Sequence, residues 1–483
     1  MNDSNGPRTE QQQVGLDPSY HMIGIGGHGM SVVAELLQVQ GARVSGSDRD
    51  DSETLHLLQG MGIDAYTPHG AKEFDVDATV VLSSAIKPGN VELIAARERG
   101  QKIIHRSQAL ALAARDQSFV AVAGTHGKTT SSAMIAVALL EAGMDPSFAI
   151  GSSIDGVGTG ARSGTEVFIA EADESDRSFL NYSPQIELIT NIEPDHLDSF
   201  GTAEAFYDIF RQFADRIVSG GSLVCCAEDR GSVELALKMR AREDITILTY
   251  GRPECSLVEP DVSILNAEVG TEGTVATLRY REVDTSLELV ATGEHNLVNA
   301  AGAWACCLSL GVAPEVAAKG LAAFRGTERR FEVCGVDQGR TLIDDFAHHP
   351  TEVATALRQA RLVAGDNNVI VVFQPHLYSR TKFFKQEFAD ALAIADTAVV
   401  ADIDGAREDA SQGVGITSDL IVDLAPDGAN LILGGPAVNA ARTGADLTGA
   451  GDLCILMGCG NIYLQEPTVL KRWAETPLDT DDK

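Results

Sequence analysis

The sequence predicts an α/β protein of three domains, each built on a mostly parallel sheet. Short apolar runs typical of buried strands alternate with longer helical patterns along the whole chain. This strand–helix pattern begins afresh near residues 19, 116 and 326. A chain of 483 residues exceeds what one hydrophobic core usually supports. Three α/β domains of ordinary size account for the length and the pattern together.

Each domain has its own predicted elements. The first, residues 19–115, starts with a strand, a glycine turn, a helix and a second strand, at His21–Gly26, Gly24–Gly29, Ser31–Gln40 and Arg43–Ser47. The second, residues 116–325, starts with a strand, a loop and a helix, at Phe119–Ala123, Gly124–Gly127 and Thr129–Ala142. The third, residues 326–475, has buried strands at Thr341–Asp345, Val369–Gln374, Thr397–Asp402 and Asp452–Met457. We expect disordered tails at residues 1–18 and Thr476–Lys483.

The strongly acidic composition limits the partners of the protein. The formal net charge is −32, which repels nucleic-acid backbones and anionic lipid surfaces, so we expect neither as a partner. Any phosphate-bearing ligand therefore needs a local positive field from Lys, Arg, a metal ion or backbone N–H groups. Whether the chain is a monomer or a homodimer does not follow from its charge or length.

Cysteine usage and hydropathy indicate a reducing compartment. The eight cysteines include the adjacent pairs Cys225–Cys226 and Cys306–Cys307, and no CxxC occurs, so neither a zinc ribbon nor a disulfide framework is indicated. The segment Met1–Tyr20 lacks the apolar core of a signal peptide, and no apolar run reaches 18 residues. We expect a cytoplasmic protein.

A glycine-rich loop in the first domain predicts a diphosphate site. Gly24-Ile-Gly26-Gly27-His28-Gly29 fits G-x-G-x-x-G between a strand and a helix, and Asp48 follows the second strand. Backbone N–H groups and a helix N-terminus in such a loop cradle a diphosphate, as in Rossmann-like folds. The loop alone leaves NAD, another diphosphate ligand, and a purely structural tight turn open.

A second loop predicts nucleotide triphosphate binding. Ala123-Gly124-Thr125-His126-Gly127-Lys128-Thr129-Thr130 nearly matches the Walker A pattern, departing from it only where Val122 replaces a glycine. Backbone N–H groups would surround the phosphates, Lys128 would neutralise their charge, and the Thr129 hydroxyl would bind Mg²⁺. This predicts a domain like those of P-loop ATPases.

Acidic residues at two predicted strand ends fit a metal beside that loop. Glu171 directly follows the apolar run before Asp173 and Asp176, and His196 lies in Glu193-Pro-Asp-His-Leu-Asp198 after another strand. Carboxylates at the carboxyl ends of parallel strands beside a phosphate loop are where Mg²⁺ binds. Asp173 and Asp176 fit solvated loop positions equally well.

Polar clusters in the last third complete the candidate residues. Asn296 and Asn299 open a helix, Arg329-Arg330-Phe331 precedes a strand, and Asp344-Asp345-Phe346-Ala347-His348-His349-Pro350-Thr351-Glu352 ends one. Taken alone, the Asp, His and Glu of the last block fit a hydrolase metal site. Arg380, after the strand that ends in Gln374, fits an anion-binding residue or a simple surface ion pair.

These blocks, in this order, resemble the Mur ligases over nearly the whole chain, from His21 to about Ile462. The resemblance rests on GIGGHGM, SGSD, GTHGKTT, EADESD, TNIEPDHLD, HNLVNA, RRFE, DDFAHHPTE and FQPHLYSRT. Each motif alone is weak, and the ordered set is specific. It is most similar to the branch that adds L-alanine to UDP-N-acetylmuramate. The implied fold has a Rossmann-like N-terminal domain, a central P-loop ATPase-like domain and a C-terminal Rossmann-like domain.

The resemblance implies a reaction and a set of site residues. ATP would phosphorylate the lactyl carboxylate of UDP-N-acetylmuramate, and the amine of L-alanine would attack the acyl phosphate. The implied catalytic residues are Lys128, His348 and Arg380. The implied ATP-binding residues are Gly124, Thr125, His126, Gly127, Lys128, Thr129, Thr130, Asn296, Arg330 and Asp345. The implied UDP-sugar residues are Gly24, Gly26, Gly27, His28, Gly29, Met30, Asp48, Ser83 and Ser84. Thr129 and Glu171 would hold one Mg²⁺ ion, and His196 would ligate a second.

Two further comparisons with the family concern selectivity. Several sister ligases use a carbamylated lysine near Mg²⁺, whereas no lysine occurs here between Lys128 and Lys238, as in the alanine-adding branch. Many relatives have Ala, Tyr and Arg where His28, Phe346 and Leu377 stand. The last two differences bear on the choice between alanine, glycine and serine.

Three alternatives to this function remain at the level of sequence. A recycling ligase that adds a whole tripeptide to UDP-N-acetylmuramate shares the fold and the motifs. An NAD-dependent oxidoreductase would explain the first glycine loop, but would leave the loop at Lys128 and the DDFAHHP block unexplained. A non-catalytic nucleotide-binding module would lose nothing when Lys128 is replaced.

Overall fold

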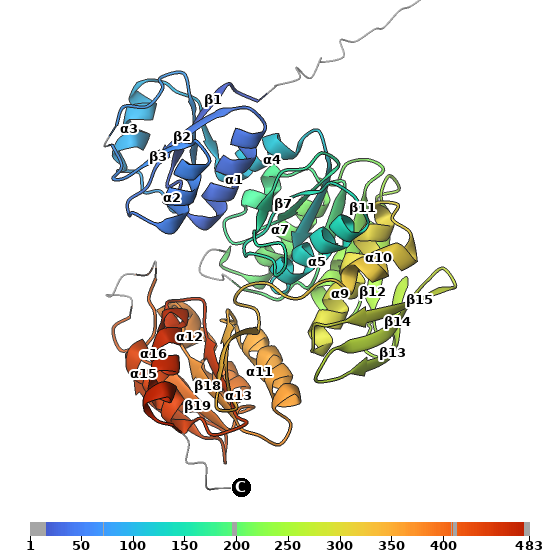
Figure 1. Cartoon of the computed structure of the whole chain (residues 1–483). Helices are drawn as coiled ribbons and strands as arrows, with labels where there is room; N and C mark the ends of the chain where they lie inside the picture. Colours follow the sequence, from blue (N-terminus) through green and yellow to red (C-terminus); the bar gives the residue numbers. More distant parts are fainter. Residues whose placement is uncertain (1–15, 71, 196–199, 407, 409–412, 478–483) are drawn as a thin grey trace, which may run out of the picture. The chain divides into compact units, whose positions relative to one another are not determined.

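The computed structural model describes residues 16–70, 72–195, 200–406, 408 and 413–477. Contacts divide the chain into two units. The first comprises the N-terminal part up to Ser118 together with Ala161–Ser163, and the second comprises the remainder (Figure 1).

The first unit is a parallel α/β sheet of Rossmann-like topology. Its strand order is β3-β2-β1-β4-β5, and every adjacent pair is parallel. The order reverses between β1 and β4, which is where ligands bind in open α/β sheets. Its elements are β1 (Ser19–Ile23), α1 (His28–Val39), β2 (Arg43–Ser47), α2 (Glu53–Gly60), β3 (Asp64–Tyr66), β4 (Thr79–Leu82), α3 (Val91–Glu98), β5 (Ile103–His105), α4 (Arg106–Ala114) and β8 (Ala161–Arg162).

The second unit starts with a mixed sheet in the strand order β15-β14-β13-β12-β11-β10-β6-β9-β7. Strands β6, β10, β11 and β12 are parallel, and β13–β15 form antiparallel hairpins. Apolar residues of α5, α9 and α10 pack on one face. The elements are β6 (Ser118–Ala123), α5 (Lys128–Glu141), β7 (Ser147–Ala149), β9 (Val167–Glu171), η1 (Ser178–Asn181), β10 (Ile186–Ile189), α7 (Ala203–Ala214), β11 (Ser222–Cys226), α8 (Arg230–Met239), β12 (Thr246–Gly251), β13 (Val262–Val269), β14 (Thr274–Tyr280), β15 (Val283–Leu289), α9 (Glu294–Ser309) and α10 (Pro314–Leu321).

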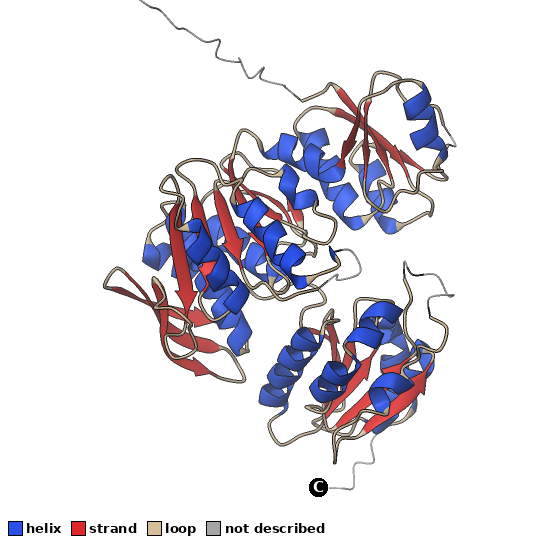
Figure 2. Ribbon diagram, turned by 180° about the vertical axis from the view of Figure 1, so that it is seen from behind, coloured by secondary structure: helices blue, strands red, loops and turns tan. Residues whose placement is uncertain are grey.

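A second sheet, in the order β16-β17-β21-β18-β19-β20, completes this unit. It is parallel except for the edge strand β16, and helices cover both of its faces (Figure 2). Helices α11, α13 and α14 pack on one face, and α15 and α16 pack on the other. The elements are β16 (Glu332–Asp337), β17 (Arg340–Asp345), α11 (Pro350–Ala364), β18 (Val369–Phe373), α12 (Tyr378–Phe383), α13 (Lys385–Leu392), β19 (Thr397–Ala401), α14 (Asp419–Val422), β20 (Leu431–Gly435), α15 (Ala437–Leu447), β21 (Leu453–Met457), η2 (Ile462–Gln465) and α16 (Glu466–Glu475).

The predicted elements are present, with small differences at their ends. Strand β2 has the predicted bounds, whereas α1 begins at His28, three residues earlier than expected, because Gly27 serves as its N-cap. At two positions within the expected disordered tails, the structure instead shows hydrogen-bonded residues. Asp17 accepts hydrogen bonds from Thr79 and Lys102, and the carbonyl of Thr476 accepts one from Arg340. Residues 1–15 and 478–483 lie outside the described residues.

All eight cysteines are free thiols, as the sequence predicted. Cys225 and Cys226 are adjacent on β11 and buried, and Cys306 and Cys307 are buried in α9. Burial raises the pKa of Cys226 and of Cys307 to about 12, so these thiols stay protonated. Cys255, in the loop after β12, is exposed. Within the described part of the chain, no helix has the length and apolar character that crossing a membrane requires.

One buried side chain in the central sheet has no partner. Ile186 and Leu188 of β10 face the apolar cluster with α5 and α9, so Glu187 faces the opposite side because side chains alternate along a strand. Glu187 is fully buried, and neither of its carboxyl oxygens is hydrogen-bonded to a described residue. Burial, with a smaller contribution from Asp215, raises the pKa of Glu187 well above its ordinary value.

We predict that Glu187→Gln makes the protein less sensitive to alkaline pH. A carboxyl whose pKa is raised by folding stabilises the fold below its unfolded pKa of about 4.3, and that contribution is lost as pH rises towards the folded pKa, by at most about 1.4 kcal/mol per pH unit. Urea denaturation from pH 5 to pH 8 measures this loss. Wild-type protein should lose more stability over this range than Glu187→Gln, and equal slopes would contradict the assignment.

Candidate functional site

The phosphate loop connects β6 to α5 and requires its glycines. Gly124 and Gly127 have φ values of +135° and +79°, which side chains rarely adopt. A Cβ on Gly124 would also lie 2.1 Å from Oγ1 of Thr190. Asn191, just after the neighbouring strand β10, accepts a hydrogen bond from the N–H of His126 at 2.9 Å. The loop shape is therefore fixed from the adjacent strand.

Lys128, the first residue of α5, is held by a buried carboxylate. Its Nζ lies 3.0 Å from Oε2 of Glu174 and also donates to the carbonyl oxygens of Gly124 and Thr125. Burial raises the pKa of Glu174 to about 7, and the positive charge of Lys128 acts against that rise. The sequence did not single out Glu174, because EADESD offers four carboxylates without indicating which one lies inward.

Two of the three predicted metal ligands lie together. Oγ1 of Thr129 donates to Oε2 of Glu171 at 3.1 Å, and Gly151 N–H holds the other carboxylate oxygen at 2.6 Å. Two neighbouring hard oxygen atoms beside a phosphate loop fit Mg²⁺. The third predicted ligand, His196, lies outside the described residues.

A cavity of about 430 Å³ brings together candidate ATP-binding residues from separate motifs. It is lined by residues of the phosphate loop, by the start of α9 and by the segment around Arg330. Its lining includes the predicted residues His126, Gly127, Thr130, Asn296, Arg330 and Asp345. Asn299, named from the sequence together with Asn296, and His295 of the same motif also line it. Lys128 and Thr129 are not part of this lining.

Asp345 organises the two loops that border this cavity. Its two carboxylate oxygens accept the N–H groups of Phe331 and Ala347, each within 2.9 Å. Burial raises the pKa of Asp345 to about 6. Arg329 and Phe331, on either side of Arg330, have φ values of 59° and 54°, so this segment is strained. Asp345 therefore holds Arg330 in place.

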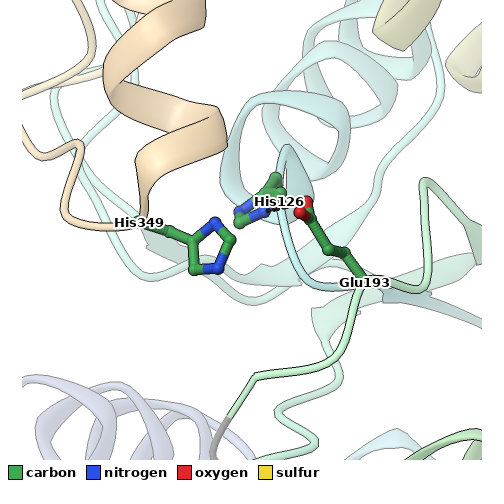
Figure 3. Close-up of side chains that lie close together, drawn as sticks. All are labelled: His126, Glu193 and His349. Carbon is green, nitrogen blue, oxygen red and sulfur yellow. Dashed lines mark hydrogen bonds and ion pairs between the residues drawn. The ribbon is translucent and has the colours of Figure 1, made fainter. Parts of the chain in front are cut away.

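His126 lies between carboxylates of two motifs. Its Nε2 is 3.1 Å from Glu193 and its Nδ1 is 3.2 Å from Glu352. Figure 3 shows Glu193 and His349 beside the His126 ring, and ligand atoms of the three residues lie within 4.8 Å of one another. Burial alone would lower the pKa of His126, but Glu352 and Glu193 outweigh it and raise the pKa to about 9. We therefore interpret His126 as a cation.

Of the other two predicted catalytic residues, Arg380 is buried and His348 is partly buried. Nη2 of Arg380 forms an ion pair with Asp195 at 3.0 Å. His348 bonds through Nδ1 to the carbonyl of Phe346, and burial lowers the pKa of His348 to about 3, so its ring is neutral. Phe346 packs between Arg329 and Arg330, while Leu377 is buried at the N-cap of α12 with a φ of 70°.

In the first unit, the predicted UDP-sugar residues follow the adjacent strands β1, β2 and β4. Gly26 N–H donates to Oδ2 of Asp48 at 2.8 Å, so Asp48 shapes the loop itself. Gly24 has a φ of +82°, Gly27 is the N-cap of α1, and Met30 is buried. Ser83 and Ser84 follow β4, and Ser84 contacts His105 at 3.2 Å. The side chain of His28 lies outside the described residues.

Arg106 is a candidate that the sequence analysis missed. A methyl group built on Gly29 would lie 1.8 Å from Nη1 of Arg106, so this guanidinium rests directly on the glycine loop. A cation at this position supplies the local positive field that a diphosphate needs in an acidic protein. The only signal in the sequence is an arginine after a short apolar strand, which is not distinctive.

Comparison with known families agrees with this arrangement. Residues 19–118, 122–307 and 329–460 match, respectively, the Mur ligase family catalytic domain, the Mur ligase middle domain, and the glutamate ligase domain of Mur ligases. The chain belongs to the Mur ligase family. Its three-domain α/β architecture, predicted from the sequence, is confirmed.

Several relatives share a single activity name. UDP-N-acetylmuramate–L-alanine ligases from Kineococcus radiotolerans and Paenarthrobacter aurescens are 47% and 44% identical to this chain. The alignments cover 94% and 93% of this chain, respectively, and 96% of each relative. The crystal structure of a UDP-N-acetylmuramate–alanine ligase from Thermotoga maritima matches with a TM-score of 0.76 and 25% identity, over 95% of this chain and 99% of that one.

We predict that Asp345→Asn weakens both stability and ATP use. The amide has one accepting oxygen, so one of the two N–H groups now bound loses its partner, at a cost of about 1–3 kcal/mol. Thermal denaturation should show a lower Tm, and the KM for ATP should rise severalfold. The exposed Asp366→Asn serves as the control. An unchanged KM for ATP would argue against the role of Asp345 in holding Arg330.

Proposed function

We propose that the protein joins L-alanine to the lactyl carboxylate of UDP-N-acetylmuramate at the expense of ATP, in the synthesis of peptidoglycan precursors. The observation that carries this proposal is the cavity where phosphate-loop residues meet Asn296, Arg330 and Asp345. It occurs in a chain 47% identical to a ligase with this activity name.

Lys128 and the loop N–H groups bind the ATP phosphates in this proposal. Before nucleotide binds, Lys128 forms an ion pair with Glu174. When nucleotide binds, the Lys128 ammonium group pairs with the phosphates instead. Arg330 and Asn296 lie in the cavity, on the side where the ribose and base of the nucleotide would bind. The catalytic contribution is positioning and charge neutralisation, which is most of what phosphoryl transfer needs.

The acyl transfer follows the family pattern. A lactyl carboxylate oxygen attacks the γ-phosphorus, and ADP leaves. The amine of L-alanine then attacks the acyl carbon, its proton is lost, and phosphate leaves. Arg380 is suited to the phosphate charge, and the neutral ring of His348 is suited to the amine side. Arg380 must first exchange its bond to Asp195 for the substrate.

Thr129 and Glu171 are the described residues that would hold Mg²⁺. When bound, this ion would neutralise phosphate charge. His196 would ligate a second Mg²⁺ ion, a role that rests on its motif alone. The glycine loop, with Met30, Asp48, Ser83, Ser84 and Arg106, would bind the UDP portion. We further propose that the protein acts in the cytoplasm, as a monomer or a homodimer.

We predict phosphate release that depends on ATP, Mg²⁺, UDP-N-acetylmuramate and L-alanine together. A colorimetric phosphate assay with single amino acids, and then with the tripeptide, measures it. Lys128→Met should lower kcat at least a hundredfold with folding intact, whereas the exposed Lys319→Met should match wild type. Release with the tripeptide alone would assign the protein to recycling. Full activity in Lys128→Met would contradict the mechanism.

We predict that Arg106→Gln raises the KM for UDP-N-acetylmuramate about tenfold, since a charge-assisted bond to a diphosphate contributes roughly 1.5–3 kcal/mol. The KM for ATP should stay within twofold of wild type. Arg97→Gln, an exposed arginine of the same unit, is the matched control. An equal rise in both KM values would point to a general structural effect instead.

A further inference from the structure

Glu352 has no role in the proposed reaction, although four polar partners surround it. It occupies the third position of α11, and its side chain is 10% exposed. The four partners are His348, His349, His126 and Arg330. Oε2 accepts the N–H groups of His348 and His349 at 3.1 and 3.3 Å and lies 3.2 Å from Nδ1 of His348. The other oxygen, Oε1, lies 3.2 Å from Nδ1 of His126 and 3.8 Å from Nη1 of Arg330.

Helix capping explains only half of this arrangement. His349 and Glu352 form a capping box at the start of α11, which uses Oε2. Glutamine serves a capping box as well as glutamate does, because only an accepting oxygen is needed. The cap therefore gives no reason for a second, charged oxygen directed at the phosphate loop.

The phosphate loop supplies that reason. His126 is the loop residue whose ring lies between Glu193 and Glu352, so its two ring nitrogens face carboxylates from two different motifs. Glu193 comes from the same sheet as the loop, whereas Glu352 comes from the segment that also contains His348. Glu352 thus contacts both the loop that would bind the phosphates and the segment next to the acyl-transfer side.

We propose that Glu352 is a positioning residue that holds His126 and Arg330 in the geometry that binds nucleotide. It acts through these two cations and does not touch the substrate. The inference rests on the nucleotide-binding part of the proposed function. In this proposal the nucleotide site depends on the segment that contains His348. Phosphoryl transfer and acyl transfer therefore both rely on the carboxylate of Glu352.

The variant Glu352→Gln separates positioning from charge. The amide keeps the capping bonds of Oε2 and removes the negative charge at His126 and Arg330. Removing a carboxylate near phosphates would, by electrostatics alone, strengthen nucleotide binding. Positioning predicts the opposite result, which is that the Kd for ADP with Mg²⁺, measured by calorimetry, rises about tenfold.

A double-mutant cycle with His126→Gln tests whether the effect passes through His126. If it does, the double variant should bind ADP no more weakly than the weaker of the two single variants. Glu315→Gln, an exposed glutamate in the first turn of α10, is the matched control and should bind like wild type. Steady-state assays should show kcat/KM for ATP reduced by a similar factor.

Each outcome decides the proposal. Weaker, non-additive ADP binding in a folded Glu352→Gln variant supports it. Unchanged or tighter binding, or purely additive effects, overturns it. Loss of folding in Glu352→Gln also overturns it, because the amide retains the cap. Calorimetry with ADP needs no acceptor substrate. A failure of the ligase assay in wild-type protein is therefore distinguishable from a failure of this inference.

Discussion

The cations around the phosphate loop are already paired with carboxylates, and the rest of the site depends on this pairing. Lys128 pairs with Glu174, His126 with Glu193 and Glu352, and Arg380 with Asp195. The chain as a whole has a net charge of −32. Any buried cation or anion that had no partner would carry a large desolvation cost. Under the proposed function, binding a triphosphate here would exchange one set of anions for another.

Two carboxylates shape the loops of the site as well as its charge. Asp345 binds the N–H group of Phe331, in the strained Arg330 segment, and that of Ala347, in the loop after β17, and Glu352 caps the helix that follows His349. Backbone strain persists only where surrounding bonds over-determine it. The positive φ values of Arg329 and Phe331 are therefore stabilised by the residues that also set the electrostatics of the cavity. Local folding and ligand binding cannot be optimised separately at these positions.

The fold and the local motifs were predictable, whereas the pairings between motifs were not. The strand at Arg43–Ser47 and the loop around Lys128 follow from patterns of a few adjacent residues, which dictate local geometry. Arg380 taken alone fitted either an anion-binding residue or a surface ion pair. It does form an ion pair, but a buried one, with Asp195 at a separation of 185 positions. Glu174 and Arg106 were missed because only tertiary packing distinguishes them from neighbouring charged residues.

The distribution of thiols has a practical consequence for spectroscopy. Cys255 is the exposed cysteine, and the others are buried or partly covered. Its N–H bonds to the carbonyl of Arg252, whose guanidinium pairs with Glu294 at the first position of α9. That helix contributes Asn296 and Asn299 to the cavity. A fluorophore attached to the native Cys255 would thus lie beside the ion pair that joins this loop to the cavity-lining helix, with no engineered labelling site.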